Sequence, residues 1–221
     1  GLMLSGLAAA IRIAPEPEYI AAAEKSVDFL FSKMFRNNFL LHVYKDGHAK
    51  LLGYLDDYAF VAQGLIDLYE VLFDRRLLER AVELTEIMLR EFWDDSSCGF
   101  FYTGKSHEPL ISRAKPIFDA SIPSGNASAT EVLLRLSHLT GNMSYAERGE
   151  KILRSYYDAM ESQPFGFAHM LGALDFYLEK PKEIVLIGNR QDPGTAALLD
   201  NIHSLYLPNI TLQLASPDSP M

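Results

Sequence analysis

Two adjacent aspartates stand at the start of an apolar run, in the segment GYLDDYAF at residues 53–60. Apolar residues recur at helical spacing in the run that follows, which predicts that Asp56 and Asp57 lie in the first turn of a helix. A helix N-terminus offers free backbone N–H groups and a partial positive charge, and both favour carboxylates. One carboxylate is enough to cap the helix, so the second is free for a ligand, with Tyr54 and Tyr58 beside it.

A second polar segment, IFDASIPSGNAS at residues 117–128, precedes another apolar helix. Ser124 is predicted to cap this helix, and Gly125 allows close packing there. Asp119 supplies a further carboxylate and Asn126 a side-chain amide. Carboxylates for acid–base chemistry next to aromatic faces for stacking suit a sugar, and helix capping is the alternative explanation for the same residues.

The catalytic candidates are therefore Asp57 and Asp119. The substrate-binding candidates are Tyr54, Asp56, Tyr58, Arg113, Ser124 and Asn126. Arg113 is included because its guanidinium would offset Asp119 or bind an anionic group. No histidines have metal-ligand spacing such as HExxH, and GxGxxG is missing after the apolar run at 184–187, so neither a metal nor a cofactor is expected.

An internal repeat positions these segments. Three stretches that begin at Leu7, Leu65 and Leu133 share one frame, each a helix, a short break and a second helix. Small residues at one position of the frame indicate close helix contact: Ala23, Ala81 and Gly149. In this frame Asp57 corresponds to Gly125, so both polar segments begin the first helix of successive antiparallel helical hairpins.

Long connections join the hairpins, and each is predicted to form a short β-hairpin, around KDG at 45–47 and TGK at 103–105. The last part of the chain has the pattern strand, helix, strand, with Asp192 before Pro193 at the start of the helix. The sequence thus predicts a mainly α fold over residues 1–180 and a small β-α-β unit over residues 181–221.

Composition limits the function. The 221 residues include 20 Lys and Arg against 29 Asp and Glu, and the resulting net charge of −9 disfavours nucleic acid and anionic membrane surfaces as partners. Cys98 is the single cysteine, so no internal disulfide is expected. With no signal sequence and no long apolar stretch, we expect a cytoplasmic protein.

Four segments together resemble a known family: GYLDDYAFVAQGLIDLYEVLFD, FWDDSSCGFFYTG, PIFDASIPSGNASATEVLLRLSHLTG and HMLGALDFYLEKPKEIVLIG. They are similar to the C-terminal half of the spermatogenesis-associated thioredoxin-like proteins. That family joins a thioredoxin-like domain to a six-hairpin α/α toroid related to N-acylglucosamine 2-epimerases and several glycosidases. The resemblance implies that this chain is part of a toroid, with Asp57 and Asp119 near a central funnel.

Two functions follow as expectations from this resemblance. The first is a carbohydrate-binding or carbohydrate-active toroid, a sugar isomerase, an epimerase or a glycosidase-like enzyme for a small sugar; the histidines of the isomerase relatives have no matched position here. The second is a non-catalytic scaffold that partners the thioredoxin-like domain of the parent chain. Half a toroid also leaves an open apolar edge, which would favour a homodimer.

Overall fold

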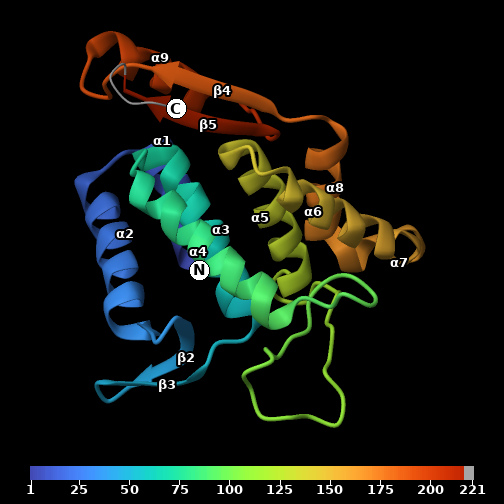
Figure 1. The fold of residues 1–221 in the computed structure, drawn as a ribbon. Coiled ribbons are helices and arrows are strands. Elements are labelled where there is room, and N and C mark those ends of the chain that lie inside the picture. The colour runs from blue at the N-terminus through green and yellow to red at the C-terminus, as the bar shows by residue number, and fades with distance from the viewer. Residues whose placement is uncertain (217–221) are drawn as a thin grey trace.

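The computed structural model describes residues 1–216 and is mainly helical (Figure 1). Its first hairpin consists of α1 (Leu2–Ile13) and α2 (Pro17–Phe29), the second of α3 (Leu55–Leu72) and α4 (Arg75–Phe92), and the third of α5 (Gly125–Thr140) and α6 (Met143–Ser155). Short helices α7 (Tyr157–Ser162) and α8 (Ala168–Leu178) follow, separated by a 3₁₀ turn at Pro164–Phe167. The predicted hairpins are confirmed, and no second helix pairs with α8 in the described chain.

The helices fall into two layers. The helices α1, α3, α5 and α8 contact one another in sequence order, while α2, α4 and α6 each pack on the outside of their own hairpin partner. The pattern of burial explains this. Most of α3 is buried all round, whereas α4 buries a single stripe that includes Leu77, Ala81, Leu84 and Met88.

Small residues allow the two layers to approach, as the repeat predicts. Ala23 and Ala81 are fully buried, and a Cβ at Gly149 would lie 2.8 Å from a methyl carbon of Leu134. The breaks between paired helices are capped locally. The carboxylate of Asp74 accepts the N–H of Arg76 at the start of α4.

The first long connection forms the expected β-hairpin. After a π-helical turn at Leu30–Met34 and a short β1 (Phe35–Arg36), the strands β2 (Phe39–Lys45) and β3 (His48–Leu52) pair antiparallel. Asp46 and Gly47 turn the chain, both with positive φ.

The second predicted β-hairpin is wrong. Residues 94–124 form an irregular loop whose strand pairing is an isolated bridge between Trp93 and Phe100. Side chains hold this loop instead: Lys115 Nζ lies 2.6 Å from Oδ2 of Asp94 and donates to the carbonyl of Cys98. The Lys115 ammonium, with Ser96 and Ser97, holds the pKa of Asp94 well below its usual range.

The C-terminal unit contains β4 (Lys182–Ile187), α9 (Pro193–Ser204) and β5 (Ile210–Ala215), with the two strands parallel. Figure 1 shows this unit across one end of the helices, whereas the β2–β3 hairpin and the 94–124 loop lie at the other end. Strand β5 contacts α3 and α5, and Oε1 of its Gln213 accepts the hydroxyl of Tyr69 on α3 at 3.5 Å. None of the helices within residues 1–216 is long and apolar enough to cross a membrane.

Candidate functional site

The start of α3 carries a histidine–carboxylate pair. The N-cap residue is Tyr54 rather than one of the aspartates, and Asp57 Oδ2 accepts the backbone N–H of Tyr54 at 2.8 Å. The same oxygen lies 2.8 Å from Nδ1 of His42, on β2. Asp57 therefore contributes to the cap of α3 as the N3 residue of a capping box and not as the N-cap residue, and the same carboxylate orients a half-exposed imidazole.

Aromatic rings gather beside this pair. The ring of Tyr54 stacks on Tyr102 with centroids 4.8 Å apart, and it contacts the edge of His42 at 5.0 Å and His107 at 5.2 Å. Leu55 N–H donates to the carbonyl of Tyr102, which fixes the 94–124 loop against the start of α3. Sequence reasoning missed Tyr102; the aromatic run FFY at 100–102 was the available signal.

Asp56 brings the two polar segments into contact. A Cβ at Gly125 would come within 2.2 Å of Asp56 Oδ1, so glycine is required at the start of α5 to admit this carboxylate. Oδ1 is buried without a hydrogen-bond partner among the described residues. Burial, and then the neighbouring charge of Asp57, raise the pKa of Asp56 above its usual range.

Asp119 connects two helix starts. Its Oδ1 accepts the N–H of Ser124 and its Oδ2 accepts the N–H of His169, both at 2.8 Å. Ser124 in turn caps α5 by accepting the N–H of Ala127. The cap predicted at Ser124 is confirmed, and both oxygens of Asp119 serve to hold α5 against α8.

A shallow cavity of about 390 Å³ lies over this junction, lined in part by Asp119 and His169 but not by Asp57. His169 Nε2 lies 2.9 Å from Oε2 of Glu131 on α5. Burial by itself would lower the pKa of His169, but the hydrogen bond and charge of Glu131 more than offset it, so the pKa is raised. The pairing of His169 with Glu131 was not foreseen from the sequence.

Besides Ser124, three of the predicted binding residues have their polar groups engaged by the protein. Tyr58 is buried, its hydroxyl accepts the N–H of Leu40 at 2.8 Å, and burial raises its pKa to about 12. Asn126 is fully buried and donates from Nδ2 to the carbonyls of Phe100 and Pro116, while its Oδ1 accepts the N–H of Phe100.

Arg113 is the third. Its guanidinium donates to the carbonyls of Thr103 and Glu91 and lies over the ring of Phe101, 4.2 Å from the centroid. It therefore does not offset Asp119, and it anchors the 94–124 loop to the end of α4.

A charged network between the inner helices was also missed. Arg135 on α5 lies 2.5 Å from Asp67, 3.1 Å from Glu70 and 3.3 Å from Glu131. Gln63 Nε2 donates to Glu131, which connects this network to His169. The i, i+4, i+7 spacing of Gln63, Asp67 and Glu70 was visible in the sequence, but its partner on α5 depends on how the hairpins pack.

This arrangement of inner and outer helices defines an α/α toroid protein. The chain superimposes on cellobiose 2-epimerase from Bacillus thermoamylovorans with a TM-score of 0.55 and 17% identity, covering 70% of this chain and 42% of that one. It matches a family 76 glycoside hydrolase, an α-mannanase from Bacteroides thetaiotaomicron, with a TM-score of 0.59 and 15% identity over 91% and 54% of the two chains. At these identities the likeness shows the fold alone.

The sequence is also similar to a known protein. The chain is 33% identical to spermatogenesis-associated protein 20 of Rattus norvegicus over 229 aligned residues, which cover 99% of this chain and 29% of the relative. No protein-family model matches it. The chain is similar over nearly its whole length to part of spermatogenesis-associated protein 20, the family that its motifs resemble, and spans about 29% of the length of this relative.

Proposed function

We propose that the loop end of the inner helices binds a small carbohydrate, with His42 and Asp57 as an acid–base pair and Tyr54 and Tyr102 as the stacking surface. The observation that carries this proposal is the 2.8 Å contact between His42 Nδ1 and Asp57 Oδ2, beside two parallel tyrosine rings. A carboxylate that holds one ring nitrogen leaves the other to exchange a proton with a ligand.

The roles of the other residues follow from their contacts. Asp56, whose pKa burial raises, lies next to Asp57 and would accept a hydrogen bond from a sugar hydroxyl. Asp119 is a positioning residue in this proposal, because it fixes His169 at the edge of the shallow cavity. The toroid neighbours act on sugars, cellobiose and α-mannan by their names, and this supports the choice of ligand class.

The test is a calorimetric titration of the chain with cellobiose, α-mannobiose, glucose and mannose. We expect one of these sugars to bind, and we expect Asp57→Asn and His42→Gln to weaken that binding by about tenfold or more, since each removes a charge-assisted contact. Asp74→Asn is the matched control, because Asp74 caps α4 at the other end of the hairpin and pairs with Arg76.

A second function is favoured by a specific observation. The polar atoms of Asn126 and Arg113 and both oxygens of Asp119 are occupied by protein groups, as a non-catalytic scaffold for a thioredoxin-like domain requires. Two results together would favour the scaffold function over sugar binding. The first is that no sugar binds, and the second is that Asp57→Asn lowers the stability by the same amount as Asp74→Asn.

A further inference from the structure

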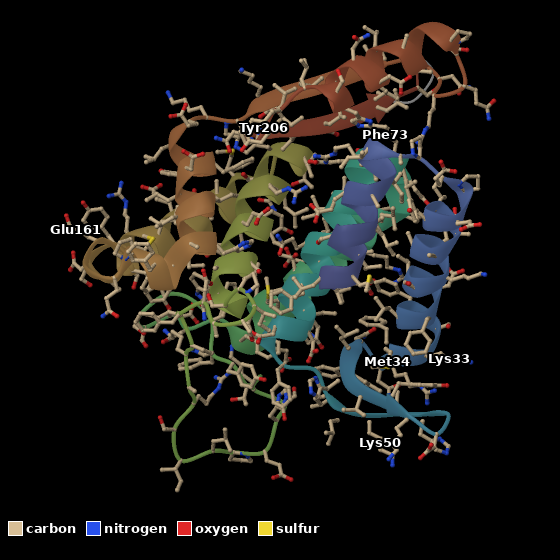
Figure 2. All side chains as sticks on the ribbon, turned by 180° about the vertical axis from the view of Figure 1, so that it is seen from behind. Lys33, Met34, Lys50, Phe73, Glu161 and Tyr206 are labelled. Carbon is tan, nitrogen blue, oxygen red and sulfur yellow. The ribbon has the colours of Figure 1, made fainter. Side chains whose placement is uncertain are left out.

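A second concave site lies at the opposite end of the helices from His42 and Asp57. A cavity of about 420 Å³ opens between the end of α1, the end of α3 and helix α9. Figure 2 places the labelled Phe73 and Tyr206 at this end and Lys50 at the other. The 18 residues of α3 separate the two sites by roughly 27 Å, at 1.5 Å per residue.

The walls of this cavity are largely apolar. The aliphatic residues that line it are Ile11, Ile13, Pro15, Val71, Ala196 and Leu199. Its volume lies within the range of sites that take small organic molecules. Such a cavity binds the hydrocarbon part of a ligand through its apolar side chains, and its few polar groups fix the orientation of the ligand.

Two guanidiniums supply those polar groups. Arg12 is 40% exposed, and its closest carboxylate, Glu70, is 4.0 Å away and shared with Arg135. Arg190 donates to the carbonyl of Leu72 at 3.1 Å and forms no ion pair with a carboxylate in residues 1–216. In a protein with a net charge of −9, two arginines with a single carboxylate in the same wall, Asp200, form a local positive site.

His203 completes the polar side of the cavity. Its Nε2 is buried and has no hydrogen-bond partner among the described residues. Burial first, and then the charges of Arg12 and Arg190, lower the pKa of His203, so the ring is neutral near pH 7. Arg12 and His203 also line an adjoining cavity of about 260 Å³, so the basic wall serves both spaces.

We propose that this cavity binds a small organic anion, whose carboxylate or phosphate head is held by Arg12 and Arg190 and whose apolar body lies against α1 and α9. Arginine suits such a head because its planar fork donates two parallel hydrogen bonds to carboxylate or phosphate oxygens. His203 adds a neutral donor or acceptor, and an anion bound there would offset the repulsion from Arg12 and Arg190 that adds to the effect of burial on the ring. This site is independent of the proposed sugar site.

The experiment is a calorimetric titration of the whole chain with hexanoate, hexyl phosphate, hexylamine and acetate. We expect both anions that carry a hexyl group to bind, with their ratio identifying the preferred head. Hexylamine should not bind, because its cationic head meets two guanidiniums. Acetate should bind more weakly than hexanoate, because it lacks the apolar body. Equal binding of hexanoate and hexylamine would overturn the proposal, and so would the failure of both hexyl anions to bind.

Variants locate the binding. Arg12→Gln should weaken the binding of the hexyl anions by about tenfold, and the His203 ring resonances should shift to a higher pKa when hexyl phosphate binds to the wild type. Ile13 is 85% exposed at the cavity wall, so Ile13→Asp can weaken and Ile13→Lys strengthen binding without a threat to folding. Arg154→Gln, on exposed α6, is the control. Unchanged affinity in both Arg12→Gln and Ile13→Asp would contradict the assignment.

Discussion

Asn126 shows how one side chain orders a long loop. The 94–124 segment has almost no strand pairing, yet this buried amide satisfies both backbone groups of Phe100 and the carbonyl of Pro116. A ladder of backbone hydrogen bonds is thus replaced by one residue at the start of α5. The sequence indicated Asn126 as a polar residue at a helix start. It could not show that the side-chain amide bonds to the backbone of the 94–124 loop and is therefore not free for a ligand.

Replacing Asn126 by alanine should lower the free energy of unfolding by about 3 kcal/mol, because the two buried backbone groups of Phe100 and the carbonyl of exposed Pro116 lose their partner. Urea denaturation followed by circular dichroism measures this. Asn142→Ala is the control: Asn142 caps exposed α6 and should cost about 1 kcal/mol. Equal losses for the two variants would mean that water replaces the Asn126 contacts.

Gly125→Ala should destabilise the protein by about 2 kcal/mol, because the added methyl would overlap Asp56 Oδ1 and approach Leu55 Cγ at 3.0 Å. Adding Asp56→Ala should recover part of that loss. Gly6→Ala on α1, where a Cβ meets nothing within 4 Å, should instead stabilise by about 0.5 kcal/mol. A neutral Gly125→Ala in thermal unfolding would show that the two helix starts do not touch in solution.

His169 gives the stability a pH dependence with a definite sign. Its folded pKa is raised above the unfolded value of 6.5, so its contribution is fully present below that pH and is lost as pH rises through the folded pKa. Stability of the wild type relative to His169→Gln should therefore decrease between pH 6 and pH 8.5. Denaturation curves at the two pH values test this, and a constant difference would contradict a charged pair with Glu131.

At the scale of elements, the charged network ties α3 to α5. Removing Arg135 would leave the carboxylates of Asp67, Glu70 and Glu131 without their cation in a largely buried position. Arg135→Ala should therefore cost about 4 kcal/mol. Arg154→Ala, in an exposed i, i+4 pair with Glu150, should cost about 0.5 kcal/mol or less. Chemical denaturation distinguishes these values, and similar small losses would mean that the network is solvated.

Helices and strands whose apolar residues recur at regular spacing were predictable from the sequence, and irregular segments were not. The helical repeat, the turn at Asp46 and Gly47 and the strand–helix–strand order of the C-terminal unit follow local rules of spacing and turn chemistry. The second β-hairpin failed because side-chain bonds from Arg113 and Lys115 compete with strand pairing in the loop. The pairs His42–Asp57 and His169–Glu131 each join residues from two different elements. They form only once those elements pack together, and the spacing of apolar residues does not predict which side chains then meet.

At the scale of the whole molecule, the C-terminal unit packs on the helices through β5. Leu212 of β5 is 2% exposed and lies outside the hydrophobic core of the helices, whereas Leu198 on α9 is 55% exposed. Because β5 also contacts α3 and α5, we expect the unit and the helices to unfold together, so Leu212→Ala should lower the free energy of unfolding of the whole molecule by about 3 kcal/mol, and Leu198→Ala by no more than about 0.5 kcal/mol. Far-ultraviolet circular dichroism of urea unfolding tests both. A Leu212→Ala curve that matches the wild type would show two independent units.

The contact of Asp56 with Gly125 bears on how the repeated hairpins could diverge. The repeat frame makes Asp57 and Gly125 counterparts, yet Gly125 touches the acid next to its own counterpart. Two copies of the α3 hairpin would place Asp57 where Gly125 now admits Asp56, and the added side chain would overlap that carboxylate. Two copies of the α5 hairpin would bring only Ser124 and Gly125 to the same contact. An engineered array of identical hairpins from this chain would therefore have to repeat the glycine version, and it would lose the paired aspartates.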